Sequence, residues 1–288
     1  MIQNIIEFCA EDGAILNGWT NGKTTDTVII EVHGMTSNCF KKREKVIAEK
    51  LQNIGVDALC INTRGSGIVR YLKYIDGKKV LSGTGYEDVE ESYLDILGAI
   101  KYAISLGYTS IYLQGHSLGA TKVVYTYNKL KNENNDVLPY IKAVVLLSLV
   151  DLPKMFAKEY TKEMLEYALE MEQKGRINAL MPQEKSPYPM TVKTFLRYSK
   201  YNENIDFARY DELDYAYPEL NNIHVPLFIR WGNVNEIISK DAKDIVDIVQ
   251  RKLKNVNKDV DYIEIANHTY ENCEVMLANQ IAEFIKQI

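Results

Sequence analysis

The sequence lacks the features of membrane-spanning, disulfide-rich secreted and nucleic-acid-binding proteins. Its four cysteines are scattered, without the C-x-x-C spacing of a zinc site or the pattern of a disulfide framework. No apolar run approaches the length that crosses a bilayer, and the acidic N-terminus lacks the basic start of a secretory signal. The net charge is −5 and the basic residues form no long block, which argues against a nucleic-acid partner. We therefore expect a cytoplasmic protein that binds neither membrane nor nucleic acid.

Strands and helices are predicted to alternate along most of the 288 residues. Residues 2–8 and 14–19 predict a short antiparallel pair, and 68–85 predict an irregular, basic insertion. Further apolar, β-branched runs predict strands at 27–32, 57–62, 110–113, 141–149, 225–231 and 261–265. Helical spacing of apolar residues predicts helices near 39–54, 86–106, 120–130, 239–254 and 271–287. This order favours an α/β fold with a mainly parallel, twisted sheet of about eight strands and helices on both faces.

One long segment interrupts this alternation. Residues 152–222 lie between two predicted core strands and contain a helical pattern, a Pro-rich piece with three X-Pro pairs at 181–189, and many aromatic residues. A connection of about seventy residues is too long for a plain loop, so it should have structure of its own. Because it leaves the C-terminal end of a strand, where ligands bind in open α/β sheets, we expect a helical cap over the site. The predicted division is a core of 1–151 and 223–288 and a cap of 152–222.

The segment 109–124, TSIYLQGHSLGATKVV, contains the strongest functional motif. An apolar strand runs directly into Gly115-His116-Ser117-Leu118-Gly119, and a helix-compatible stretch follows. This order of strand, G-x-S-x-G and helix is typical of a nucleophile elbow, in which a strained turn exposes the serine above the sheet. Ser117 is therefore the candidate nucleophile.

Histidine is scarce, so the base that Ser117 requires can be sought by elimination. His116 adjoins the serine on a turn that directs its side chain elsewhere, and His33 belongs to the loop after a strand. His224 precedes a strand, at the wrong edge of the sheet. His268 follows the last strand, in the chain order expected for the base of a strand–turn–helix hydrolase. His268 is the predicted base.

The acid that orients this base has two candidates. The loop after Trp231 carries Asn235, which cannot hold a charge, where an aspartate is common, and Glu236 one residue later. Asp151, at the end of the 141–149 strand, is the alternative, because some triads take their acid from that position. Either carboxylate could hold the tautomer of His268 and stabilise its imidazolium.

An oxyanion hole needs two preorganised amides. The N–H groups of Leu118, directly after the serine, and of Met35, after His33-Gly34, are the candidates. Candidates for the substrate pocket are His33, Gly34 and His116, which lie close to these positions in the sequence, and the aromatic Trp231 at the end of the strand 225–231.

Taken together, these motifs resemble the α/β-hydrolase superfamily across essentially the whole chain. The matching segments are His33-Gly34, Arg64-Gly65-Ser66-Gly67, Gly115–Gly119, the cap-sized insertion and Asn267-His268. Within the superfamily the chain looks most similar to the esterase-like hydrolases of the DUF1749 group, through segments 33–38, 83–87, 115–117 and 231–236. The superfamily resemblance implies Ser117 as nucleophile, His268 as base and the Leu118 and Met35 amides as oxyanion hole; the narrower one favours Glu236 as acid.

The chemistry predicted from these residues is acyl transfer to water by a serine hydrolase. The substrate would be a small-molecule carboxylic ester, thioester, amide or lactone, and no metal or organic cofactor is required. The same residues also suit an acyltransferase or a natural-product tailoring enzyme, and a ligand receptor that keeps the fold without catalysis is the non-enzymatic alternative. Both a monomer and a homodimer are compatible with the sequence.

Overall fold

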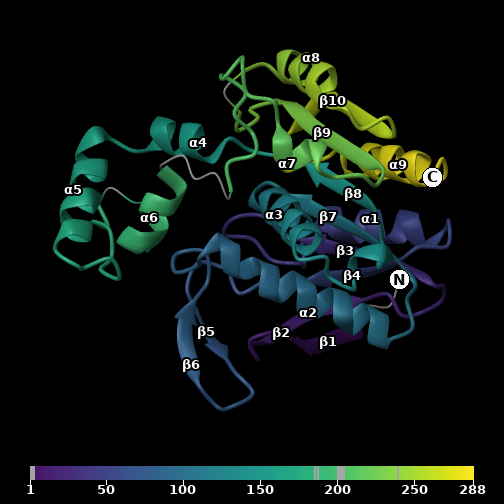
Figure 1. The fold of residues 1–288 in the computed structure, drawn as a ribbon, viewed down its shortest axis with the longest axis horizontal. Coiled ribbons are helices and arrows are strands. Elements are labelled where there is room, and N and C mark those ends of the chain that lie inside the picture. Colours follow the sequence, from purple (N-terminus) through teal and green to yellow (C-terminus); the bar gives the residue numbers. More distant parts are fainter. Residues whose placement is uncertain (1–3, 185, 187, 200–204, 239) are drawn as a thin grey trace.

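An eight-stranded sheet forms the centre of the computed structural model, which describes residues 4–184, 186, 188–199, 205–238 and 240–288 (Figure 1). β1 pairs antiparallel with β2, and β2 antiparallel with β4, whereas all later neighbours are parallel. The predicted mainly parallel sheet is confirmed. In spatial order the strands are β1 (Asn4–Cys9), β2 (Ile15–Thr20), β4 (Asp57–Ile61), β3 (Thr27–Val32), β7 (Ser110–His116), β8 (Ile141–Leu147), β9 (Leu227–Val234) and β10 (Lys258–Asn267).

Helices cover both faces of the sheet because successive strand residues point to opposite sides. In β3, Val28 and Ile30 pack in one hydrophobic cluster and Ile29 in another. The first cluster lies under α2 (Ser92–Ser105), α3 (Leu118–Asn132) and α8 (Ala242–Lys252). The second lies under α1 (Lys42–Gln52) and α9 (Glu274–Ile285). Short 3-10 helices at Val89–Glu91 and Leu138–Tyr140 precede α2 and β8, so α2 begins later than the sequence predicts.

The prediction of an irregular insertion at 68–85 is wrong. This segment contains an antiparallel hairpin of β5 (Arg70–Lys73) and β6 (Lys79–Ser82), which projects from the body beside the sheet (Figure 1). Leu72 is buried against the body, whereas Tyr71 faces outward opposite Leu81. Frequent lysine and arginine at outward positions obscure this alternation in the sequence.

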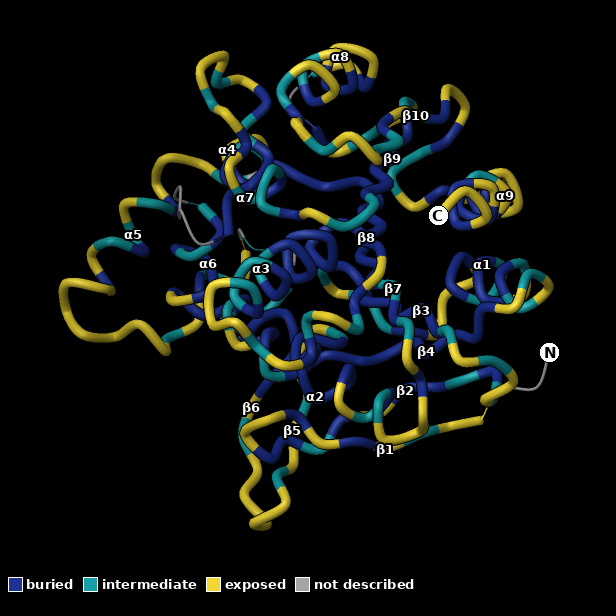
Figure 2. The backbone as a smooth tube through the Cα atoms, turned by 45° about the vertical axis from the view of Figure 1, so that its right-hand side comes forward, coloured by how far each residue is buried: buried dark blue, intermediate teal, exposed yellow. Residues whose placement is uncertain are grey.

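Residues from the predicted cap contribute to two packing regions. α4 (Leu152–Glu159), α5 (Lys162–Gln173) and α6 (Val192–Ser199) share a third hydrophobic cluster and lie beyond the C-terminal ends of the parallel strands (Figure 1). The segment from Phe207 to Ile223, with α7 (Pro218–Asn221), packs instead in the α2–α3–α8 cluster. Figure 2 shows the strands as mostly buried, whereas the outer turns of α5 and the end of the hairpin are exposed.

In the described part of the chain, no helix combines the length and apolar composition that would let it span a bilayer. Over the same residues no three His, Cys, Asp or Glu side chains are grouped as ligands for a metal ion. All four cysteines are free thiols.

Candidate active site

Ser117 occupies a sharp turn between β7 and α3. Its backbone has φ 55° and ψ −124°, a conformation that non-glycine residues rarely adopt and that stores strain. The neighbouring glycines make the turn possible: a Cβ on Gly115 would lie 2.2 Å from the Gly119 oxygen, and one on Gly119 would lie 2.3 Å from the Val32 oxygen. The sequence thus folds into the elbow geometry that its motif predicts.

A continuous hydrogen-bonded chain joins Ser117, His268 and Glu236. His268 Nε2 lies 3.0 Å from Ser117 Oγ, and His268 Nδ1 is bonded to Glu236 Oε1. The three side chains come from the elbow, from the end of β10 and from the loop after β9. Because the carboxylate accepts a hydrogen bond from Nδ1–H, the neutral imidazole carries its proton on Nδ1 and presents an unprotonated Nε2 to the serine hydroxyl.

The Glu236 carboxylate is buried, and protein groups donate hydrogen bonds to both of its oxygens. Oε2 accepts hydrogen bonds from the Ser148 hydroxyl at 2.8 Å and the Gly232 amide at 2.9 Å, and Oε1 accepts from the Ile237 amide at 2.9 Å. Burial by itself raises the pKa of Glu236, but hydrogen bonding to His268, Ser148 and Gly232 outweighs it and lowers the pKa below its usual value. Glu236 therefore stays ionised beside the imidazole.

Asp151, the alternative acid, is placed elsewhere. It is the N-cap of α4, and its carboxylate accepts a hydrogen bond from the Lys154 amide at 3.1 Å. Burial raises the pKa of Asp151 to about 6. Of the two candidates, Glu236 is the one bonded to His268.

Two residues that the sequence reasoning did not single out support the acid and the base. Ser148 follows β8 with φ 47°, and its hydroxyl oxygen lies 3.1 Å from that of Tyr270 as well as bonding Glu236. The Tyr270 hydroxyl in turn donates to the Arg230 carbonyl at 2.7 Å. The sequence feature that could have pointed to Ser148 is its position: it is a polar residue directly after the largely apolar run 141–147, whose strand ends beside the strand that leads to Ser117.

The other three histidines have different surroundings. His116 Nε2 donates to the His268 carbonyl at 2.7 Å, and burial together with the Arg43 cation lowers the pKa of His116 well below its usual value. His33 is buried behind Gly34 and bonded to its carbonyl oxygen at 2.8 Å. His224 precedes β9, and its Nε2 lies 3.0 Å from Lys131 Nζ on α3.

The two amides predicted for an oxyanion hole flank the serine. Leu118 is the first residue of α3, where amide groups and the helix dipole favour negative charge. Met35 lies in the turn Gly34–Ser37, which the Ser37 amide closes on the Gly34 carbonyl at 3.3 Å. Gly34 packs so tightly on the elbow that a Cβ there would lie 3.0 Å from Ser117 Cβ.

A cavity of about 740 Å³ opens above Ser117 and His268. Met35, Met155, Tyr188 and Ile237 supply apolar surface, so α4 and the segment near 188, both within the predicted cap, form part of its wall. Two of the basic side chains in the wall are paired: Lys42 with Glu274, also in the wall, at 3.0 Å, and Arg43 with the buried Glu44 behind it at 2.5 Å. Lys41 and Glu271, of opposite sign, complete the charged lining.

Of the four residues predicted to line the pocket, Gly34 and His116 do so. His33 and Trp231 lie outside the lining, and their predicted placement is corrected. Trp231 alternates to the other side of β9, where it is fully buried and its indole N–H donates to the Leu149 carbonyl at 3.0 Å. His33 is excluded because Gly34 and the Met35 turn lie between its ring and the cavity.

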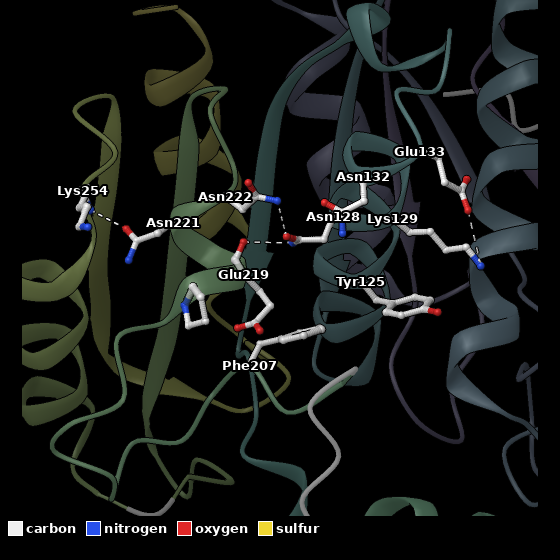
Figure 3. A pocket seen from close by; sticks show the side chains of 11 residues that line it. Tyr125, Asn128, Lys129, Asn132, Glu133, Phe207, Glu219, Asn221, Asn222 and Lys254 are labelled. Atoms are coloured by element: carbon white, nitrogen blue, oxygen red, sulfur yellow. Dashed lines mark hydrogen bonds and ion pairs between the residues drawn. The ribbon is translucent and has the colours of Figure 1, made fainter.

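A second cavity, of about 720 Å³, lies between α3 and α7, away from Ser117 (Figure 3). Its asparagines already bond one another and the backbone: Asn128 Nδ2 donates to the Glu219 carbonyl at 3.0 Å, and Asn222 Nδ2 donates to Asn128 Oδ1 at 2.8 Å. These bonds tie α7 to α3, which is a structural role.

Solved structures similar to this chain include esterases and other hydrolases. Est1E from Butyrivibrio proteoclasticus, determined with bound ferulic acid, is 18% identical over 97% of this chain and 98% of its own, with a TM-score of 0.68. The esterase Pf2001 of Pyrococcus furiosus is 19% identical over 99% and 91%, with a TM-score of 0.63. The α/β hydrolase GrgF from Penicillium sp. sh18 is 15% identical over 100% and 99%, with a TM-score of 0.70.

No family model and no curated protein matches the chain in sequence. Structural likeness at these identities establishes the fold alone. The narrower likeness to the DUF1749 group is not shown.

Proposed function

We propose that this chain, which has the α/β-hydrolase fold, is a serine hydrolase that cleaves a small-molecule carboxylic ester through an acyl-enzyme intermediate. The observation that carries the proposal is the hydrogen-bonded chain from Ser117 Oγ through His268 to Glu236. The cavity of about 740 Å³ above it gives an acyl group a place to bind. The esterases among the similar structures support the same reaction class.

In this mechanism His268 Nε2 takes the proton of Ser117 as Oγ attacks the substrate carbonyl carbon. Glu236, held ionised by its donors, stabilises the imidazolium that forms. The amides of Leu118 and Met35 bind the tetrahedral oxyanion. The carbon–oxygen bond to the alcohol then breaks as His268 returns its proton to the leaving oxygen, and water repeats the sequence to release the carboxylic acid.

The lining of the cavity supports an uncharged, partly apolar acyl group. Lys42 and Arg43 are each paired with a carboxylate, so the wall offers little unneutralised charge to an ionic substrate. Met155 and Ile237 provide apolar contact for an acyl chain. Thioesters, lactones and amides remain substrates of the same chemistry, and an amine or alcohol acceptor in place of water would make the enzyme an acyltransferase.

Turnover of p-nitrophenyl esters from acetate to octanoate tests the proposal. We expect a burst of about one p-nitrophenolate per chain followed by slower steady hydrolysis, since an activated ester releases p-nitrophenolate in a fast acylation and deacylation then limits turnover. Ser117→Ala should abolish the burst, whereas Ser105→Ala, at the exposed end of α2, should retain it. Small alcohols and amines added to the assay would divert product from acid to new ester or amide if the acyl group is transferred. Folded protein that turns over no ester, thioester, lactone or amide contradicts the proposal.

A further inference from the structure

A chain of buried polar side chains connects the turn that carries Met35 with the cap helix α6. Its members are almost completely inaccessible to solvent: His33 is 1% exposed, Thr63, Lys122 and Tyr198 are 0%, and Glu87 is 3%. They come from five separate segments of the sequence, and the reaction described above uses none of them. Burying this many polar groups costs free energy unless each is paired, so their arrangement requires an explanation.

The chain begins at the Gly34 carbonyl. Since a carbonyl oxygen can only accept, the 2.8 Å contact with His33 places the ring proton on Nδ1. Burial and the nearby Lys122 ammonium lower the pKa of His33 to about 3, so the ring is neutral at physiological pH. His33 Nε2 must then be an acceptor, and it accepts from Thr63, whose amide and hydroxyl each lie 3.2 Å away.

This contact fixes the direction of the Met35 amide. In a planar trans peptide the C=O and the N–H point to opposite sides. Because the His33 ring and the Ser37 amide hold the Gly34 carbonyl, the Met35 N–H of the same peptide is directed away from the His33 ring. A flip of this peptide would exchange an oxyanion donor for a carbonyl oxygen.

The chain continues through the elbow helix. Lys122, on α3, donates from Nζ to Thr63 Oγ1 at 3.3 Å and to Glu87 Oε2 at 2.6 Å. Since Thr63 Oγ1 accepts from Lys122, its single proton is available to His33 Nε2. The donors and acceptors therefore follow one direction from Lys122 to the Gly34 carbonyl.

Glu87 links this network to the cap. Its Oε1 accepts from the hydroxyl of Tyr198, on α6, at 3.0 Å, and its backbone carbonyl accepts from the Thr194 hydroxyl at 3.2 Å. The Lys122–Glu87 ion pair has both side chains fully buried, so removing either partner would leave an uncompensated charge. The Tyr198 hydroxyl is the contact through which the position of α6 bears on the network.

We propose that Tyr198, Glu87, Lys122, Thr63 and His33 are positioning residues that couple the seating of cap helix α6 to the orientation of the Met35 amide in the oxyanion hole. This inference rests on the proposed function for its catalytic consequence, whereas the coupling itself is a property of the fold. A cap that closes on a substrate would thereby complete the oxyanion hole, and a displaced cap would loosen it.

Two nearly isosteric variants test the coupling with little loss of packing: Tyr198→Phe removes the hydroxyl that Glu87 accepts, and Thr63→Val removes the hydroxyl between Lys122 and His33. Losing an oxyanion donor costs on the order of 10²–10³ in kcat, so loosening its anchor should lower kcat about tenfold and leave KM within about twofold. Affinity for a trifluoromethyl ketone, whose adduct carries the oxyanion, should fall in parallel. Tyr210→Phe is the matched control, because its buried hydroxyl donates to the Leu149 carbonyl at 2.7 Å, outside the network.

A structural readout separates this inference from the proposed function. The backbone amide of Met35, observed by NMR with selective ¹⁵N-methionine labelling, should shift in Tyr198→Phe and Thr63→Val and stay unchanged in Tyr210→Phe. If the wild type hydrolyses esters and both variants show the same kcat, inhibitor affinity and Met35 chemical shift as the wild type, the coupling is refuted and the proposed function stands. If the wild type turns over no substrate, the proposed function fails, and the Met35 shift still decides the coupling. Glu87→Gln, which leaves Lys122 buried without its counter-charge, should destabilise the fold and serves only as a stability comparison.

Discussion

At the scale of single residues, the site depends on a carboxylate that stays charged although it is buried. Glu236 has a side chain 2% exposed and accepts from two backbone amides, one hydroxyl and one imidazole. Asp151 accepts from the Lys154 amide through Oδ1, whereas its Oδ2 has no partner among the described residues. The same functional group thus has opposite pKa shifts at two positions, because preorganised donors favour the charged form and bare burial does not.

Glu236→Gln should therefore lower kcat far more than Asp151→Asn. A neutral amide cannot stabilise the imidazolium of His268 and can force the wrong tautomer, which costs on the order of 10²–10⁴ in kcat in such triads. Asp151→Asn keeps the α4 cap and should leave kcat within about threefold. Steady-state kinetics of both variants on one p-nitrophenyl ester measure the difference. The reverse ranking would assign the acid to Asp151.

The raised pKa of Asp151 predicts a pH-dependent cost in stability. Its pKa of about 6 in the folded protein exceeds the ordinary value of 3.8, so the unfolded state loses this proton first as pH rises. The contribution to stability is fullest below about pH 4, falls as the pH passes from about 4 to 6, and stays reduced above it.

Asp151→Asn removes this titration. Its free energy of unfolding minus that of the wild type should be larger, in the direction of greater stability, at pH 8 than at pH 4.5, by roughly 1–3 kcal/mol. Urea denaturation at the two pH values measures the change, and comparing each variant with wild type at the same pH cancels the effects of other acids. A difference that does not vary with pH would show that Asp151 is ionised normally in the fold.

At the scale of elements, the elbow shows how tightly a strand and a helix must approach to expose one side chain. The glycine two residues after Ser117 lets α3 pack on the carbonyls of Val32 and His33 at the end of β3. Those carbonyls directly precede the Met35 turn, so one close contact positions both the proposed nucleophile and the second proposed oxyanion amide.

Gly119→Ala should therefore disable the site. Its Cβ would lie 2.3 Å from the Val32 oxygen and 2.6 Å from the His33 oxygen, and backbone atoms cannot yield as a flexible side chain does. We expect kcat to fall at least 100-fold, as for loss of an oxyanion donor, together with a lower melting temperature. Gly175→Ala is the control: it has φ +70° but open space, so it should cost about 1–2 kcal/mol in stability and leave kcat unchanged. Equal activity in the two variants would contradict the close-packing account.

At the scale of the whole molecule, the sequence predicts the sheet well because its strands are buried on both faces and read as continuous apolar runs. Ser117 and His268 could be found because the order of strands fixes which strand ends lie together, whereas the same argument left Glu236 and Asp151 both as candidates for the acid. The hairpin escaped prediction because lysine and arginine interrupt its strands and the outward positions also include Tyr71 and Leu81. The Trp231 placement failed because side-chain direction depends on strand alternation. The network from His33 to Tyr198 joins distant segments, so only the tertiary structure reveals it.

The separate hydrophobic cluster of α4, α5 and α6 predicts that the cap can loosen without unfolding of the sheet. Phe156, 1% exposed, contacts the rings of Tyr160, Phe195 and Tyr198. Phe156→Ala should remove about 3–5 kcal/mol of packing from this cluster and increase proteolytic cleavage within 152–199, with little change in the main melting transition. Phe228→Ala, in the α1–α9 cluster, should instead lower that transition. If Phe156→Ala and Phe228→Ala lower the main melting temperature equally, and Phe156→Ala shows no added cleavage in the cap, the cap and the sheet unfold as one unit.

The central claim is that Ser117 is a nucleophile activated by His268, and covalent labelling by a fluorophosphonate tests it most directly, since the probe needs no knowledge of the substrate. Intact-mass and peptide mass spectrometry should find one adduct per chain, on Ser117, that is abolished in Ser117→Ala and strongly reduced in His268→Ala. Folded wild-type protein that gains no adduct, or an adduct that persists in Ser117→Ala, would contradict the account.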